Sequence, residues 1–346
     1  MIELKRDRLV FSFPDVHPEA KLEIGFQRTF RIPDDGKTYP LPPGFGFFPL
    51  CHVDDHARRV PADWLERGGV MLPMYQSEAM WLLFTAHHVS RRWASYPFAI
   101  KVAAGKINAV TGKGWSDGLN SKPQDYMVAP RQPWLDGFCV QKGLIRQFVA
   151  MPLGAGYTAE EQLTGKAEHG GLQIVIYPMK REVFERRFPE RELEERESYR
   201  SFAAGAVSRG AKYKKSDMGL APGGRMKQEI YEDPFDFDDW DLTQRGRCFV
   251  HIANSLVWRE VAGRHPPTTP PTAKEYAKAG LPWFDYYDDN AKALEGAESL
   301  AGLKSVAELG EEKGDVPLPE NDSVTPETVI KLRRNLQKDE VREGRF

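Results

Sequence analysis

The sequence predicts an α+β fold, with a mainly antiparallel β-sheet or sandwich as its core and with peripheral helices and long loops around it. Apolar residues alternate with other residues over many short segments, which is the pattern of a strand that buries one face. Glycine-containing turns separate several of these segments. With 346 residues, of which 41% are hydrophobic, the chain is also long enough to bury one large core or two modest ones.

The N-terminal part opens with strand patterns. Apolar residues alternate over 9–13 and again over 22–26. Residues 40–49 are too rich in proline and glycine for regular structure, so we expect an extended arm against the core. Residues 61–67 begin with proline and end before two glycines, which predicts a short helix. The apolar run 80–86 is too short for its period to separate helix from strand.

The clearest strand block runs from residue 96 to 178. It contains a predicted strand pair over 98–110, a hairpin over 138–151 and a further strand over 172–177. Apolar residues occur at both the odd and the even positions of 144–151, and these two sets point to opposite faces of a strand. We therefore expect this strand to be buried on both faces.

The remaining segments are mixed. Thr158 suits the N-cap of a helical turn, and 180–200 alternates opposite charges at helical spacing, as a solvated helix does. Residues 203–225 are rich in glycine, serine and lysine and predict a mobile loop, whereas 248–253 predicts a strand. Residues 325–336 predict a terminal helix.

The domain boundary is expected near residue 290. We expect residues 1–290 to form a single compact β-rich domain and residues 291–346 a charged, partly helical C-terminal extension, because aromatic residues become rare there.

Composition limits the classes of partner. The formal net charge is −2, which argues against a nucleic-acid binder, and no apolar stretch reaches the roughly 18 residues of a membrane span. The N-terminus lacks the apolar region of a secretory signal. Three widely spaced cysteines predict reduced thiols, with Cys139 and Cys248 as packing residues. A soluble, cytoplasmic protein is the expectation that these observations support.

A possible metal site lies in the segment from Cys51 to His56. His52 and His56 are four residues apart, so on a helix both imidazoles would share one face, with Asp55 beside them. Val53 stands where zinc-binding helices of this kind carry a glutamate, so a polar surface segment is the alternative.

A possible ligand site lies in the strand block and in the acidic, aromatic run 231–241. Trp134 beside Asp136 could form a platform for a ligand. The alternative is that such residues face solvent or pair across strands. The candidate ligand-binding residues are Trp134, Asp136, Arg146, Phe237 and Trp240.

Five segments carry a resemblance to a known family. They are YPFAIKVAAGKINAVTG (96–112), QPWLDGFCVQKGLIRQFVAMPLGAGYTAEEQLTG (132–165), HGGLQIVIYP (169–178), GLAPGGRMKQEIYEDPF (219–235) and PTAKEYAKAGLPWFDYY (271–287). Together they resemble a family of uncharacterised proteins of bacteria and eukaryotic microbes, and the resemblance covers most of residues 1–290. Its members are sometimes labelled integral membrane proteins, which the hydropathy of this chain contradicts. The resemblance implies kinship without an activity or a catalytic residue.

Two functional hypotheses follow. The chain contains no nucleophile elbow, dinucleotide-binding fingerprint or kinase motif, which favours an intracellular binding or interaction protein whose partner is a small molecule or a protein. The alternative is a hydrolase or metal-dependent enzyme that uses the Cys51–His56 cluster. No motif names a cofactor.

Overall fold

The computed structural model describes residues 1–190, 217–287 and 291–333. One large sheet dominates it, and sixteen of the described strands belong to this sheet. In spatial order its main path is β1 (Ile2–Lys5), β2 (Arg8–Ser12), β3 (Lys21–Thr29), β7 (Ala79–Ala86), β15 (Leu144–Pro152), β17 (Asp217–Lys227), β18 (Gly246–Asn254), β16 (Leu172–Pro178), β10 (Phe98–Ala104) and β11 (Ile107–Asn108).

Shorter strands extend this sheet or stand apart from it. Those attached to the main path are β4 (Thr38–Tyr39), β5 (Cys51–His52), β6 (Val70–Met74), β12 (Met127–Ala129), β13 (Trp134–Leu135) and β14 (Gly137–Gln141). Two separate pairs are β8 (His88–Val89) with β9 (Ala94–Ser95), and β19 (Trp283–Tyr287) with β20 (Val329–Arg333). Within the large sheet the pairs β4–β17 and β6–β18 are parallel, and the other pairs are antiparallel.

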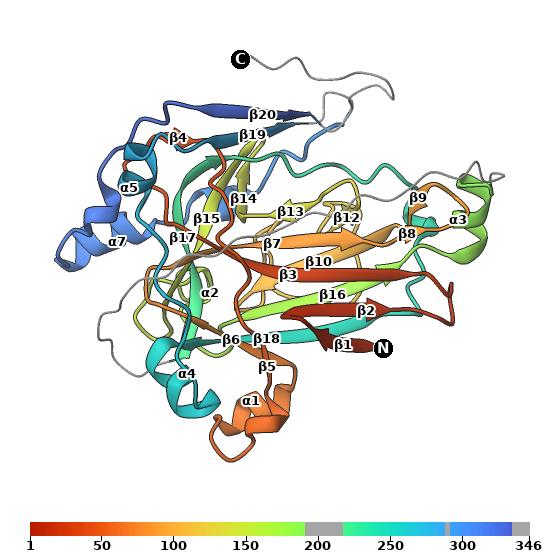
Figure 1. The fold of residues 1–346 in the computed structure, drawn as a ribbon, viewed down its shortest axis with the longest axis horizontal. Helices are drawn as coiled ribbons and strands as arrows, with labels where there is room; N and C mark the ends of the chain where they lie inside the picture. Colours follow the sequence, from red (N-terminus) through yellow and green to blue (C-terminus); the bar gives the residue numbers. More distant parts are fainter. Residues whose placement is uncertain (191–216, 288–290, 334–346) are drawn as a thin grey trace.

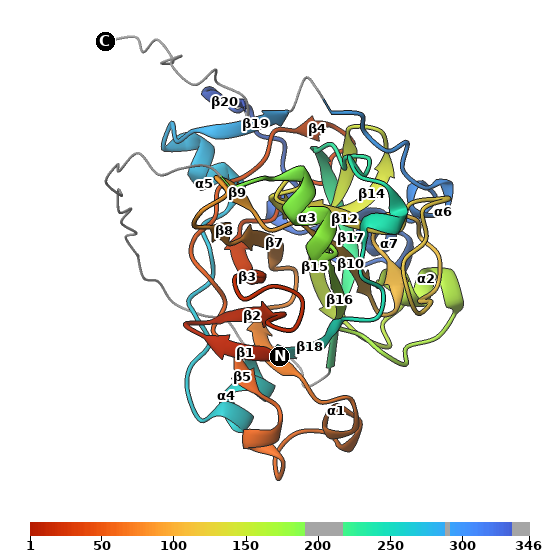
Figure 2. The same cartoon turned by 90° about the vertical axis from the view of Figure 1, so that its right-hand side faces the viewer.

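The large sheet folds over a common hydrophobic core. Figure 2 shows β1, β2 and β3 on one side of the molecule and β10, β16 and β17 on the other. Phe11 and Phe26 from the first side share one cluster of buried residues with Ile100, Ile176 and Val250. The predicted α+β class with a mainly antiparallel sheet or sandwich core is therefore confirmed.

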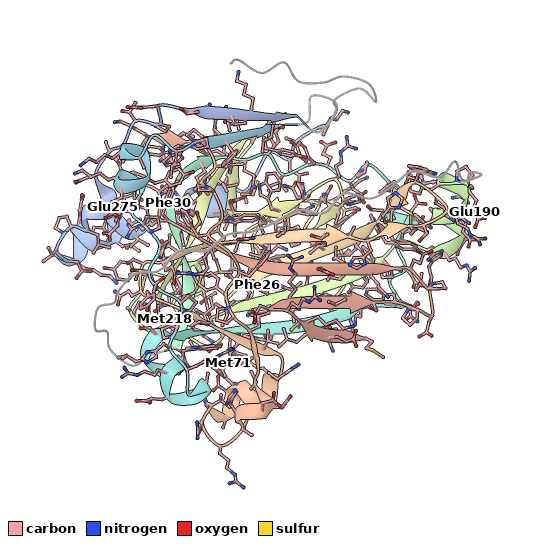
Figure 3. The ribbon with its side chains drawn as sticks, viewed as in Figure 1. Phe26, Phe30, Met71, Glu190, Met218 and Glu275 are labelled. Atoms are coloured by element: carbon pink, nitrogen blue, oxygen red, sulfur yellow. The ribbon has the colours of Figure 1, made fainter. Side chains whose placement is uncertain are left out.

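Side chains fill the interior of the molecule (Figure 3). Glu190 and Glu275 lie at opposite ends of its long axis.

Strand β15 occupies the centre of the sheet. It pairs with β7, β14 and β17, and all of its residues except the first and the last are buried. The prediction that 144–151 is buried on both faces is thus confirmed at all but its first residue. Gln147 is accommodated in this interior because its amide accepts a hydrogen bond from Ile32 N and donates one to Phe30 O, at 3.0 and 3.1 Å.

Short helices lie at the periphery of the sheet (Figure 1). Thr158 caps α2 through a capping box with Glu161, as its position in the sequence predicted. The helices are α1 (Ala62–Arg67), α2 (Ala159–Thr164), α3 (Arg181–Arg187), α4 (Ser255–Ala262), α5 (Ala273–Lys278), α6 (Glu298–Ala301) and α7 (Val306–Lys313), with single 3₁₀ turns η1 (Asp54–His56), η2 (Phe237–Asp239) and η3 (Pro319–Asn321).

Two predictions about local structure are wrong. Residues 220–225 are part of the buried strand β17 instead of a loop, because Gly224 lets the strand pass close to the main chain at Pro33. Residues 329–333 form β20, which pairs with β19, where a terminal helix over 325–336 was expected. The undecided run 80–86 lies in strand β7. Parts of the predicted 180–200 helix, the 203–225 loop and the terminal helix lie outside the described residues.

The described residues beyond 290 pack on the sheet. Leu300 and Leu303 are buried in the main core, and Val306 is buried in a smaller cluster with Val149 and Ala221. The division of the chain near residue 290 stays a prediction. No helix in the described ranges combines the length and apolarity needed to cross a membrane.

Candidate binding cavity under the C-terminal segment

A cavity of about 240 Å³ lies between the sheet and the C-terminal segment, which we define as residues 306–321. The sheet side supplies Arg31, Gln76, Ser77, Met151 and Tyr157. The C-terminal segment supplies Val306, Ala307, Gly310, Glu311, Asp315, Val316, Pro317, Leu318 and Asn321.

The sheet side of the cavity is built by the ends of strands. Arg31 follows β3, Met151 lies near the end of β15, and Ser77 lies in the turn that precedes β7. Ser77 has a φ of 66°, a left-handed conformation that few non-glycine residues adopt. Its main-chain N–H donates to Ala150 O at 2.8 Å, and its hydroxyl donates to the Met151 sulfur at 3.7 Å. These bonds hold the turn against β15.

Arg31 is the most buried charged group of the cavity wall. Its side chain is 2% exposed, and Nη2 donates to Asn321 Oδ1 at 2.7 Å and lies 4.0 Å from Asp34 Oδ2. Its Nε and Nη1 have no hydrogen-bond acceptor among the described residues. Burial lowers the pKa of this guanidinium, whereas the charges of Asp34 and Glu320 oppose that shift. Arginine stays protonated in proteins, so Arg31 places a buried positive charge at the cavity wall, and its Nε and Nη1 are enclosed by protein.

The beginning of α7 is anchored to the sheet side by polar contacts. Ser305 and Glu308 form a capping box, and the Ala307 N–H donates to Asp34 Oδ2 at 3.0 Å. Glu308 Oε2 also lies 3.4 Å from Nη2 of the buried Arg146. These contacts therefore fix the beginning of the C-terminal segment next to Arg31.

The end of α7 is anchored through Tyr157. The Tyr157 hydroxyl donates to Asp315, and the Lys313 amino group donates to Ala155 O and lies 4.1 Å from the centre of the Tyr157 ring. Partial burial and the Asp315 carboxylate raise the pKa of Tyr157 to about 12. The phenol is therefore a neutral donor near pH 7.

The lining of the cavity combines charged, polar and apolar side chains. None of the described residues that line it is a histidine or a cysteine, and the Ser77 hydroxyl faces the sulfur of Met151 and no base. The charged side chains of the lining differ in exposure, because Arg31 is buried whereas Glu311 and Asp315 are exposed. Such an arrangement can orient a small polar molecule.

The predicted ligand-binding residues of the strand block lie in three different environments. Trp134 is half-buried, and its ring lies 6.2 Å from that of Trp81 and 4.6 Å from that of Tyr286. Asp136 is buried and accepts a hydrogen bond from Gln228. Arg146 is buried, and its Nη2 lies 3.4 Å from Glu308 Oε2 in the C-terminal segment.

Phe237 and Trp240 lie elsewhere, in and beside η2. The ring of Phe237 lies 6.5 Å from that of Tyr126, and Trp240 is buried with its Nε1 donating to Asp233 Oδ2 at 2.8 Å. Within the described residues, no ring contact, ion pair or hydrogen bond joins these two to the three predicted residues of the strand block. A shared ligand site for all five stays a prediction from sequence.

The predicted metal ligands do not share a helix. His52 ends β5, whereas Asp55 and His56 belong to η1, and His52 and Asp55 are exposed. In the part of the chain that the structure describes, no three histidine, cysteine, aspartate or glutamate side chains are arranged to hold a metal ion. The assignment of His52, Asp55 and His56 gains no support from this geometry and stays a prediction.

Sequence reasoning missed the residues of the cavity. In the sequence, Arg31 is a polar residue just after a segment with an alternating strand pattern. A polar residue in such a position is expected to face solvent. Its partner Asn321 lies 290 residues further along the chain. No spacing rule links residues so far apart.

Comparison of the chain with family models, curated proteins and solved structures finds no match. The family resemblance of the five segments therefore stays a prediction.

Proposed function

We propose that this protein is a non-enzymatic binding protein that holds a small polar molecule in the cavity under the C-terminal segment. The observation that carries the proposal is the cavity itself, which has a volume of about 240 Å³ and is lined by the buried, charged Arg31 together with Glu311 and Asp315.

The size of the cavity supports a small ligand. Its volume of about 240 Å³ lies below the roughly 300–1,000 Å³ that is usual for drug-sized ligands. Apolar atoms of Met151, Val306 and Leu318 line it together with the polar groups, as is common in ligand sites.

Gly310 permits a direct test. A Cβ on this residue would lie 3.8 Å from Asp315 Cβ and 3.9 Å from the Tyr157 hydroxyl, so alanine fits in ordinary contact and a larger side chain extends into the cavity. We expect Gly310→Ala to keep the cavity open, and Gly310→Leu to fill it while leaving the helix intact.

The measurement is a thermal-shift screen of the full chain with a library of small polar molecules, followed by calorimetric titration of those that stabilise it. The wild type and Gly310→Ala should bind the same molecules, and Gly310→Leu should lose at least tenfold in affinity. The proposal fails if no molecule binds the wild type, or if Gly310→Leu binds as the wild type does.

A further inference from the structure

A proline-rich segment runs over the surface of the molecule between α4 and α5. We call it the proline strap and define it as residues 263–272, with the sequence GRHPPTTPPT. Figures 1 and 2 both show it following an extended course along the outside of the molecule from α4 to α5. Every residue of the strap is exposed or half-buried. The strap therefore lies on the protein and forms no part of its core.

The main chain of the proline strap has no hydrogen-bond ladder. From 264 to 271, no N–H or C=O group bonds to another main-chain group among the described residues. The prolines, at positions 266, 267, 270 and 271, have no N–H to donate. An extended, proline-rich segment without internal hydrogen bonds is typical of the polyproline II conformation.

Contacts with the rest of the chain hold the strap in place. The buried Arg28 donates from Nη2 to Thr268 O, at the middle of the strap. The Arg264 guanidinium lies 5.1 Å from the centre of the Trp258 ring, on α4. Helices α4 and α5 fix the two ends. A segment that is already ordered loses little conformational entropy when a partner binds to it.

A basic residue and two prolines recur at every third position of the strap. Arg264, Pro267 and Pro270 have the spacing Arg-x-x-Pro-x-x-Pro. Because polyproline II has three residues per turn, this spacing places the three side chains along one ridge. Protein domains that recognise proline-rich segments bind such ridges in grooves lined by aromatic side chains.

Arg264 adds a positive charge to this ridge. It is exposed, and it has no ion pair with any described residue, since its polar contacts are with Leu50 O and Cys51 Sγ. A carboxylate at the edge of a partner's groove would form a charge-assisted hydrogen bond with it. The charge of the strap therefore favours a partner whose groove has an acidic edge.

We propose that the proline strap is a docking site for a protein domain that binds polyproline II in an aromatic groove with an acidic edge. The bond from Arg28 holds the inner side of the strap at Thr268, which leaves the outer side for this partner. The docking site is separate from the cavity, because no residue of the strap lines the cavity.

The test is a calorimetric titration of the full chain with a purified SH3 domain that binds Arg-x-x-Pro-x-x-Pro peptides. We expect saturable binding of one domain to each chain. Since the contact includes an ion pair at Arg264, added salt should weaken it.

Replacement of the two prolines of the ridge tests their role. The double variant with Pro267→Ala and Pro270→Ala should lose about tenfold or more in affinity, because both apolar contacts with the groove are lost. Pro271→Ala is the matched control, since it removes an exposed proline of the same strap that lies outside the ridge. Its affinity should stay within about twofold of the wild type.

Arg264→Gln tests the charge at an exposed position, so it leaves the core unchanged. It should weaken the complex by about threefold or more and remove most of its dependence on salt. Thermal unfolding of each variant measures whether the fold is kept.

Two results would overturn the proposal. The wild type could show no binding up to about 1 mM of the domain, or the double proline variant could bind it as tightly as the wild type does. Neither result bears on the cavity, which the Gly310→Leu variant tests separately.

Discussion

At the scale of single residues, burial changes the chemistry of polar groups in this sheet. Asp136 is 2% exposed, and its carboxylate accepts a hydrogen bond of 2.6 Å from Gln228 Nε2. Burial raises the pKa of Asp136 to about 7, and the bond from Gln228 opposes that shift only in part. Asp136 is therefore expected to be largely protonated in the folded protein at mildly acidic pH.

This pKa predicts a pH dependence of stability. The unfolded chain releases the Asp136 proton near pH 4, whereas the folded protein keeps it until about pH 7. The contribution of Asp136 to the free energy of unfolding is therefore fully present below about pH 4 and is lost as the pH rises to about 7. Asp136→Asn should remove this loss, which amounts to at most about 1.4 kcal/mol per pH unit. Urea unfolding of the wild type and of Asp136→Asn at pH 5 and pH 7 measures this loss of stability.

The control for this prediction is Asp238→Asn, because Asp238 is exposed. Its unfolding free energy should follow the wild type across the same pH range. An unchanged pH dependence in Asp136→Asn would show that the buried carboxyl group does not titrate as expected.

At the scale of elements, β17 depends on glycine for its position beside the main chain at residue 33. A Cβ on Gly224 would lie 2.4 Å from Pro33 O, which is closer than a carbon atom and a main-chain oxygen can approach. Gly224 is therefore required by packing, although its sequence context is typical of a flexible loop.

Alanine substitutions test this role. Gly224→Ala should lower the free energy of unfolding by about 1–3 kcal/mol, because the strand or the segment at residue 33 must shift. Gly114→Ala is the matched control, since no atom lies within 4 Å of its added Cβ and its change should stay within about 0.5 kcal/mol. Chemical unfolding of both variants decides the question, and equal effects would contradict the packing role.

At the scale of the whole molecule, the residues after 290 complete the core and the cavity. Leu300 is fully buried in the main cluster, and the Ala297 N–H donates to Cys139 O at 3.1 Å, on β14. Residues 306–321 then form one wall of the cavity. This part of the chain contributes to the same interior as the strands.

Leu300→Ala tests whether this part unfolds together with the sheet. We expect a single unfolding transition that is less stable by about 2–5 kcal/mol, because the substitution leaves a cavity in the shared core. Leu281→Ala is the control, since Leu281 is 46% exposed. A separate transition for the C-terminal residues, with the main transition unchanged, would favour an independent extension. Differential scanning calorimetry of the full chain distinguishes the two outcomes.

The sequence by itself determined the elements whose patterns span only a few residues, whereas the tertiary structure decided the cavity and the strands that depend on distant contacts, such as β17 and β20. Alternation over 144–151 and the cap at Thr158 are local patterns, because side-chain direction and capping depend on residues a few positions apart. The strand through 220–225 could not be predicted, since it depends on the main chain at Pro33, which is 191 residues away from Gly224. The cavity joins Arg31 to residues such as Asp315, and Arg31 is a buried charge only because folding encloses it. Burial across such distances follows from packing, which no short pattern encodes.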